Sequence, residues 1–238
     1  MYRDAPSLGL GLGLSLRQYG AGFTGLLDAY TGAAAAYSLR KLSSSTSNVV
    51  RARRSSDDAE QDFTASQVAD GTLTTFCGAG DGFVRTWYDQ SGNARNATQA
   101  ISASQPQIVA SGALVTYDGN TCVTNETANS GIGLIIPWET INQRISQFAV
   151  YGADATETAG CLLSDANNSG TYAGLIGDGS SSATILSATL NSFRANGTAI
   201  GSPTRDLLHT NLHNNALNVA ELDITTPNNA AWSGQDLQ

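Results

Sequence analysis

The chain has 238 residues, and only 13% of them are charged, against about 25% in an average globular protein. The hydrophobic share of 41% excludes a highly charged disordered chain, and the composition is not that of a coiled coil. The net charge of −8 argues against nucleic-acid binding, which requires a basic surface. We also expect no membrane insertion, because the sequence contains no run of 18 apolar residues.

The N-terminal segment alternates strictly between leucine and a small residue. In an extended strand this alternation places all the leucines on one face and leaves the other face nearly bare. We therefore predict an N-terminal arm over residues 1–22 and one domain over residues 23–238. The segment is either a strand of that domain or an arm that docks on a neighbouring subunit, and the assembly residues are Leu8, Leu10, Leu12, Leu14 and Leu16.

The following region mixes short helices and strands. We predict a helical turn at 24–29, a strand at 34–42, a strand at 49–54 and a weak helical period over 67–76. The best strand is 83–88, which is aromatic and β-branched. Further short strands are predicted, separated by polar turns, at 106–110, 113–117, 132–136, 146–152, 160–164, 171–176, 183–190, 193–195 and 216–224.

Many short strands with polar turns between them predict an all-β sandwich or barrel. Asn196-Gly197 predicts a type I′ hairpin, since both central residues of that turn require positive φ. Asp89 opens a second turn, in which we expect its side chain to bond the loop backbone and Gly92 to take positive φ.

The sequence predicts no metal and no cofactor. The three cysteines are far apart and favour buried thiols, although one disulfide with a third free thiol stays open. His209 and His213 lack the glutamate of a zinc-protease motif. The acidic residues at 57–62 follow the arginines at 51–54, and we expect the two groups to pair, with Arg51 and Arg53 on one strand face and Arg54 pointing away.

Carbohydrate binding requires an aromatic platform together with planar polar groups. We take Trp87 as a core residue and Tyr88, the next residue on the strand, as facing outward. The candidate carbohydrate-binding residues are Tyr88, Asp89, Asn93 and Trp138. No catalytic residue is assigned, because the spacing of the carboxylates does not show which pair would face a glycosidic bond.

Two blocks of sequence carry a resemblance to known proteins. The first is Ala35–Leu42 (AAYSLRKL) followed by Val50–Phe63 (VRARRSSDDAEQDF), and the second is Thr75–Gln99, which contains the motif Tyr-Asp-Gln-Ser-Gly at 88–92. They resemble the concanavalin-A-like (laminin-G-like) jelly-roll domains of tailed-phage virion proteins, especially tail fibres. They are similar, more distantly, to the catalytic domain of α-L-arabinofuranosidase B. The resemblance covers about residues 25–110.

The resemblance implies a two-sheet antiparallel jelly-roll sandwich with short helical turns. It implies a phage virion structural protein, in a fibre or decorating the particle, that binds other virion subunits through the N-terminal arm, forms a homo-oligomer and contacts host glycans. An arabinofuranosidase-like glycoside hydrolase and an assembly-only structural module are the alternatives. The last segment, after residue 225, is expected to lack an apolar closing strand, so that the fold closes differently or the arm fills that edge.

Overall fold

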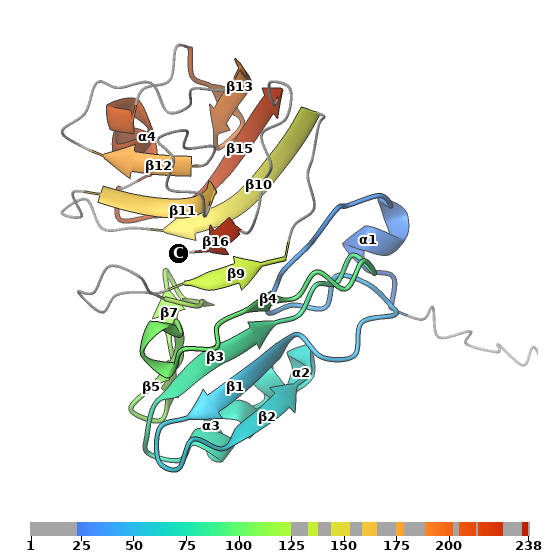
Figure 1. Cartoon of the computed structure of the whole chain (residues 1–238), viewed down its shortest axis with the longest axis vertical. Coiled ribbons are helices and arrows are strands. Elements are labelled where there is room, and N and C mark those ends of the chain that lie inside the picture. The colour runs from blue at the N-terminus through green and yellow to red at the C-terminus, as the bar shows by residue number, and fades with distance from the viewer. Residues whose placement is uncertain are drawn as a thin grey trace, which may run out of the picture.

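The computed structural model describes residues 23–124, 133–137, 144–152, 159–165, 175–178, 189–201, 205–212, 214–225 and 235–237. This part of the chain is mainly antiparallel β-structure with a few short helices, as the sequence predicts (Figure 1). No helix among these residues is both long and apolar enough to cross a membrane. The predicted arm, with Leu8 to Leu16, and Trp138 lie outside the described residues.

Ten strands form the larger sheet. Along its main path the order is β12 (Leu175–Asp178), β11 (Ala159–Asp165), β16 (Gln235–Leu237), β9 (Leu134–Ile136), β4 (Ala97–Thr98), β3 (Gly82–Trp87), β1 (Val50–Arg54) and β2 (Glu60–Phe63). Two strands lie off this path, because β5 (Gln107–Ala110) pairs with β3 and β6 (Ala113–Leu114) pairs with β5. The sheet therefore joins segments from both ends of the described chain.

A second sheet has four strands in the order β10 (Arg144–Gly152), β15 (Leu217–Thr225), β13 (Thr189–Ala195) and β14 (Thr198–Ala199). A small third sheet pairs β7 (Thr116–Tyr117) with β8 (Asn120–Thr121). The helices are α1 (Leu26–Ala29), α2 (Ala65–Ala69), α3 (Thr72–Cys77) and α4 (Arg205–Leu212), with a 3₁₀ turn, η1, at Ser102–Ser104.

The main core lies between one face of the larger sheet and the helices α2 and α3. Val50 and Ala52 of β1 point into it, and Phe63 of β2 meets Phe76 of α3 edge-on, with 5.4 Å between ring centroids. The alternation of β1 therefore leaves Arg51 and Arg53 on the opposite, outer face. That outer face carries the candidate site.

Most predicted elements of the first hundred residues are present. The helical turn at 24–29 is α1, the strand at 49–54 is β1, and the strand at 83–88 is β3. The helical period at 67–76 is present as two helices, because Gly71 takes φ +90° and separates α2 from α3.

The predicted strand at 34–42 is wrong. This segment forms no strand, and side chains of the turn at 89–93 bond its backbone where a neighbouring strand would have done so. Its run of alanines offered no alternation of polar and apolar residues from which this could be seen.

The Asn196-Gly197 hairpin is confirmed. β13 and β14 pair around it, with φ of +51° at Asn196 and +77° at Gly197, as a type I′ turn requires. Both turn residues are exposed. The Asn196 side chain also binds the neighbouring strand β15. It donates to Asn218 Oδ1 at 2.8 Å and accepts from the Val219 amide at 2.9 Å.

The C-terminal expectation is corrected. Residues 235–237 form a strand, β16, which lies between β9 and β11 in the larger sheet. The fold therefore has a closing strand that the sparse apolar content of this segment did not predict.

Candidate functional site: a polar depression around Tyr88

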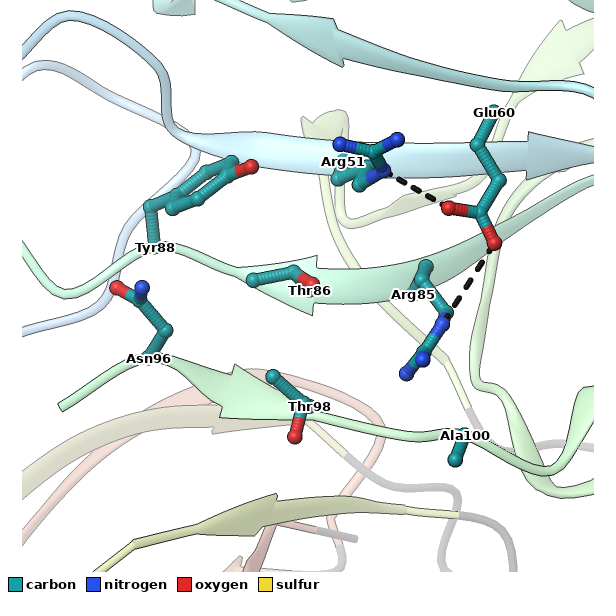
Figure 2. A pocket seen from close by; sticks show the side chains of 8 residues that line it. All are labelled: Arg51, Glu60, Arg85, Thr86, Tyr88, Asn96, Thr98 and Ala100. Atoms are coloured by element: carbon teal, nitrogen blue, oxygen red, sulfur yellow. Dashed lines mark hydrogen bonds and ion pairs between the residues drawn. The ribbon is translucent and has the colours of Figure 1, made fainter.

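A polar depression of about 470 Å³ lies on the outer face of the larger sheet (Figure 2). It spans strands β1 to β4. Its lining residues are mostly polar or charged: Arg51, Glu60, Arg85, Thr86, Tyr88, Asn96, Thr98 and Ala100.

The row of residues across the floor follows from strand register. Arg51 of β1 faces Thr86 of β3, and Thr86 faces Thr98 of β4. Residues directly opposite on neighbouring strands lie on the same face of a sheet. The three side chains therefore form one polar row, as Figure 2 shows.

A β-bulge adds a second arginine to this face. The register between β1 and β3 shifts between Arg51 and Ala52, so Arg85 is an extra residue on β3. A bulge opposes two residues to one and re-aims a side chain. As a result the consecutive residues Arg85 and Thr86 both line the depression, although strict alternation would have placed them on opposite faces.

Glu60 connects the two arginines. Its carboxylate accepts a hydrogen bond from Arg51 Nε at 2.8 Å and lies 3.6 Å from Arg85 Nε (Figure 2). Arg51 is also 3.5 Å from Asp62, and hydrogen bonding to Glu60 is the main reason that the pKa of Arg51 is raised. The charges around the depression therefore balance.

The predicted pairing of the arginines with the acidic run is confirmed. Besides the Arg51 contacts, Arg53 binds Asp58 at 2.6 Å and Arg54 binds Asp57 at 2.7 Å. Arg54 points to the other side of the strand, where it lies over the Phe76 ring at 4.9 Å. The hydrogen bond from Arg54 is the main reason that the pKa of Asp57 falls to about 2.

Tyr88 stands at the rim. Its hydroxyl donates to Asp62 Oδ1 at 2.8 Å, which fixes the ring beside the polar row. Burial, with help from this hydrogen bond, raises the pKa of Tyr88. The preceding residue, Trp87, packs on the core, with 6.2 Å between its ring centroid and that of Tyr37. The prediction that Trp87 faces the core and Tyr88 faces outward is therefore confirmed.

A second hollow of about 280 Å³ lies on the other side of Tyr88. Its walls are the 45–48 segment and the 88–92 turn. Tyr88 and Asp89 both line it, which places Tyr88 between two adjoining depressions.

Asp89 and Asn93 hold the loop beneath Tyr88. Asp89 accepts hydrogen bonds from the amides of Ala36 and Ser91 at 2.9 Å and of Arg95 at 3.0 Å, so the predicted bonds to loop backbone are present. Asn93 Nδ2 donates to the Ala33 and Ala34 carbonyls at 3.0 Å. The structure thus brings Tyr88, Asp89 and Asn93 together. Tyr88 lines the depression, whereas Asp89 and Asn93 hold the adjoining loop in place.

Sequence reasoning missed Gln90, Thr98 and Asn96. Gln90 is buried and binds three backbone groups of the 38–42 segment. Asn96 Oδ1 accepts from the Asp89 amide at 3.0 Å and also lines the depression. The Tyr-Asp-Gln-Ser-Gly motif could have indicated a structural role for Gln90, whereas no motif in the sequence marked Asn96 or Thr98 as residues of the depression.

Cys77 and Cys122 carry reduced thiols, and the side chain of Cys161 lies outside the described ones. The described residues contain no group of three histidine, cysteine or acidic side chains arranged to hold a metal. The chain matches no protein-family model, no curated protein and no solved structure.

Proposed function

We propose that the chain is a virion structural protein of a tailed phage whose outer sheet face binds host-surface carbohydrate. The sequence resemblance over residues 25–110 supports the virion role, and it supports a jelly-roll arrangement for the antiparallel sheets. The observation that carries carbohydrate binding is the open, charge-balanced depression beside the fixed ring of Tyr88.

The chemistry of the depression suits a neutral sugar. Thr86, Thr98 and Asn96 offer hydroxyl and amide groups that can donate to or accept from sugar hydroxyls. Arg51 and Arg85 share Glu60, and Arg51 also lies 3.5 Å from Asp62, so two carboxylates match the two arginines and no unpaired charge selects an anion. Tyr88 supplies an apolar ring face with a polar tip, a combination enriched at binding surfaces.

The test is a glycan array probed with the wild-type chain and with Tyr88→Ala. We expect the wild type to bind a set of neutral glycans and Tyr88→Ala to bind them at least about tenfold more weakly, which corresponds to about 1.4 kcal/mol. Tyr30→Ala is the matched control, because Tyr30 is 72% exposed and does not line the depression.

Two results would contradict carbohydrate binding as proposed. An array without hits would favour the assembly-only module. Cleavage of an aryl-arabinofuranoside, abolished by substitution of a carboxylate, would favour the hydrolase. Trp138, the fourth predicted site residue, stays a prediction, and Trp138→Ala on the same array tests it.

A further inference from the structure

The outer face of the smaller sheet carries an exposed apolar strip. Phe148 and Val150 of β10 are 69% and 70% exposed, and they lie two residues apart on the same face. Val219 of β15, 46% exposed, lies directly opposite Val150. Contiguous exposed apolar side chains mark interaction surfaces. We call Phe148, Val150 and Val219 the apolar strip.

The strip lies beside an open sheet edge. β10 pairs with β15 along all nine of its residues without a register shift, and within the described residues it has no strand on its other side. Sheet edges are usually protected by proline, charge or a bulge. β10 has none of these along its length except Arg144 at its first position.

The sequence contains a segment suited to this edge. Residues 8–16 number nine, like β10, and they contain no charge and no proline. Leu12 is the central residue of 8–16, and Phe148 is the central residue of β10. If these two residues lie opposite each other, every leucine falls on the face of the apolar strip. The glycines then fall on the inner face, where they need little room.

We propose that residues 8–16 of a neighbouring copy of this chain add as a strand to the free edge of β10 and place their leucines beside Phe148 and Val150 on the same face of the sheet. This inference rests on the proposed function as a virion structural protein and on the expectation from the sequence that the N-terminal arm docks on a neighbouring subunit. Backbone hydrogen bonds along the edge supply affinity, and the alternation of leucine and glycine decides which face of the sheet the leucines take.

Cysteine cross-linking tests the contact directly. Leu12→Cys and Phe148→Cys are prepared as separate full-length chains of different tagged mass, mixed and oxidised. Because both residues are central, they face each other whether the added strand is parallel or antiparallel. We expect a mixed dimer that a reducing agent separates. Its amount should exceed that formed when wild-type chain is mixed with either variant, because the native cysteines alone could form some disulfide. Absence of the mixed dimer overturns the proposal. If a chain that carries both substitutions forms the disulfide only within itself and never with a second copy, the proposal is overturned as well.

Sedimentation of Phe148→Glu gives a second readout. Since Phe148 is largely exposed, we expect the variant to fold and bind glycans as the wild type does, while its dissociation constant for self-association rises at least about tenfold. Ile101→Glu, at a position 64% exposed and away from the strip, should associate as the wild type does. An equal effect of the two variants would count against the strip.

The two levels of the proposal fail in different ways. If the wild type is a monomer at every concentration, this inference and the expected homo-oligomer fail, whereas the glycan array tests carbohydrate binding independently. If deletion of residues 1–18 abolishes self-association and Phe148→Glu does not, the arm docks elsewhere, and this inference alone is overturned.

Discussion

The Tyr88 hydroxyl donates to Asp62 Oδ1 across 2.8 Å, although 26 residues separate the two in sequence. Asp62 is on β2 and also contacts Arg51 of β1, while Tyr88 directly follows β3. Three strands thus set the position of one aromatic ring. A ring held in place before a ligand arrives loses little conformational entropy when it binds.

Removal of only the tyrosine hydroxyl should weaken binding less than removal of the ring. We expect Tyr88→Phe to lower glycan affinity by a few fold and the free energy of unfolding by about 1 kcal/mol, the usual net value of one hydrogen bond. Tyr88→Ala should lower affinity further. Calorimetric titration and urea denaturation measure the two effects. Equal affinities for the two variants would show that the ring face makes no contact with the sugar.

The buried amide of Gln90 should contribute strongly to stability. Its Oε1 accepts from the Leu42 amide at 2.7 Å, and its Nε2 donates to the Ser38 and Arg40 carbonyls at 2.8 and 2.9 Å. Gln90→Ala leaves these groups without partners, and we expect a loss of about 2 to 4 kcal/mol from such unsatisfied groups. Urea denaturation measures the loss, and hydrogen exchange at the Leu42 amide should accelerate. Asn93→Ala, in the same turn but exposed, should cost less.

Gly25 should not tolerate a side chain. A Cβ at this position would overlap the carbonyl oxygen of Leu42, which accepts the Leu27 amide at 2.9 Å. We therefore expect Gly25→Ala to separate α1 from the 42–44 segment and to cost about 1 to 3 kcal/mol, as in other overpacked sites. Gly201→Ala is the control, because nothing lies within 4 Å of its added Cβ and its φ is not positive. Similar thermal midpoints for the two variants would contradict the close approach.

Stability should fall in alkali partly because of Tyr37. Burial, followed by the negative charge of Asp89, raises the pKa of Tyr37, whose hydroxyl donates to the Arg95 carbonyl. The folded chain therefore keeps this proton at a pH where the unfolded chain has lost it. The resulting stability is complete below the ordinary tyrosine pKa of about 10 and is lost as pH rises through the folded value.

The measurement is urea denaturation on both sides of about pH 10, the ordinary tyrosine value. In Tyr37→Phe this contribution is absent at every pH, so its unfolding free energy should fall less steeply above that pH. Tyr30→Phe serves as the control, since Tyr30 is 72% exposed. Parallel profiles for wild type and Tyr37→Phe would contradict the assignment.

The sequence predicted those strands, turns and ion pairs that depend on residues close together in the chain. Aromatic and β-branched residues marked β3, and Asn196-Gly197 marked its hairpin because few other residues take positive φ at both positions. The outward direction of Tyr88 followed from strand alternation. The arginine and acidic runs were close enough in sequence for their pairing to be foreseen.

The rest depends on contacts between distant segments. The charged residues of β2 gave no strand pattern, because that strand is specified by pairing its acids with the arginines of β1. The bulge that turns Arg85 outward exists only in the register between β1 and β3. Asn96 and Thr98 join the site because β4 pairs with β3, which places Thr98 opposite Thr86.

The position of β16 has a consequence for biosynthesis. Residues 235–237 lie between β9 and β11, so the larger sheet stays divided until residue 237 has left the ribosome. Earlier strands emerge with their partner edges still vacant, and vacant edges are where nascent chains associate wrongly. The order of synthesis thus leaves the completion of this sheet until the last described strand has been made, and a cell that makes the protein in quantity must keep the unfinished chains apart until then.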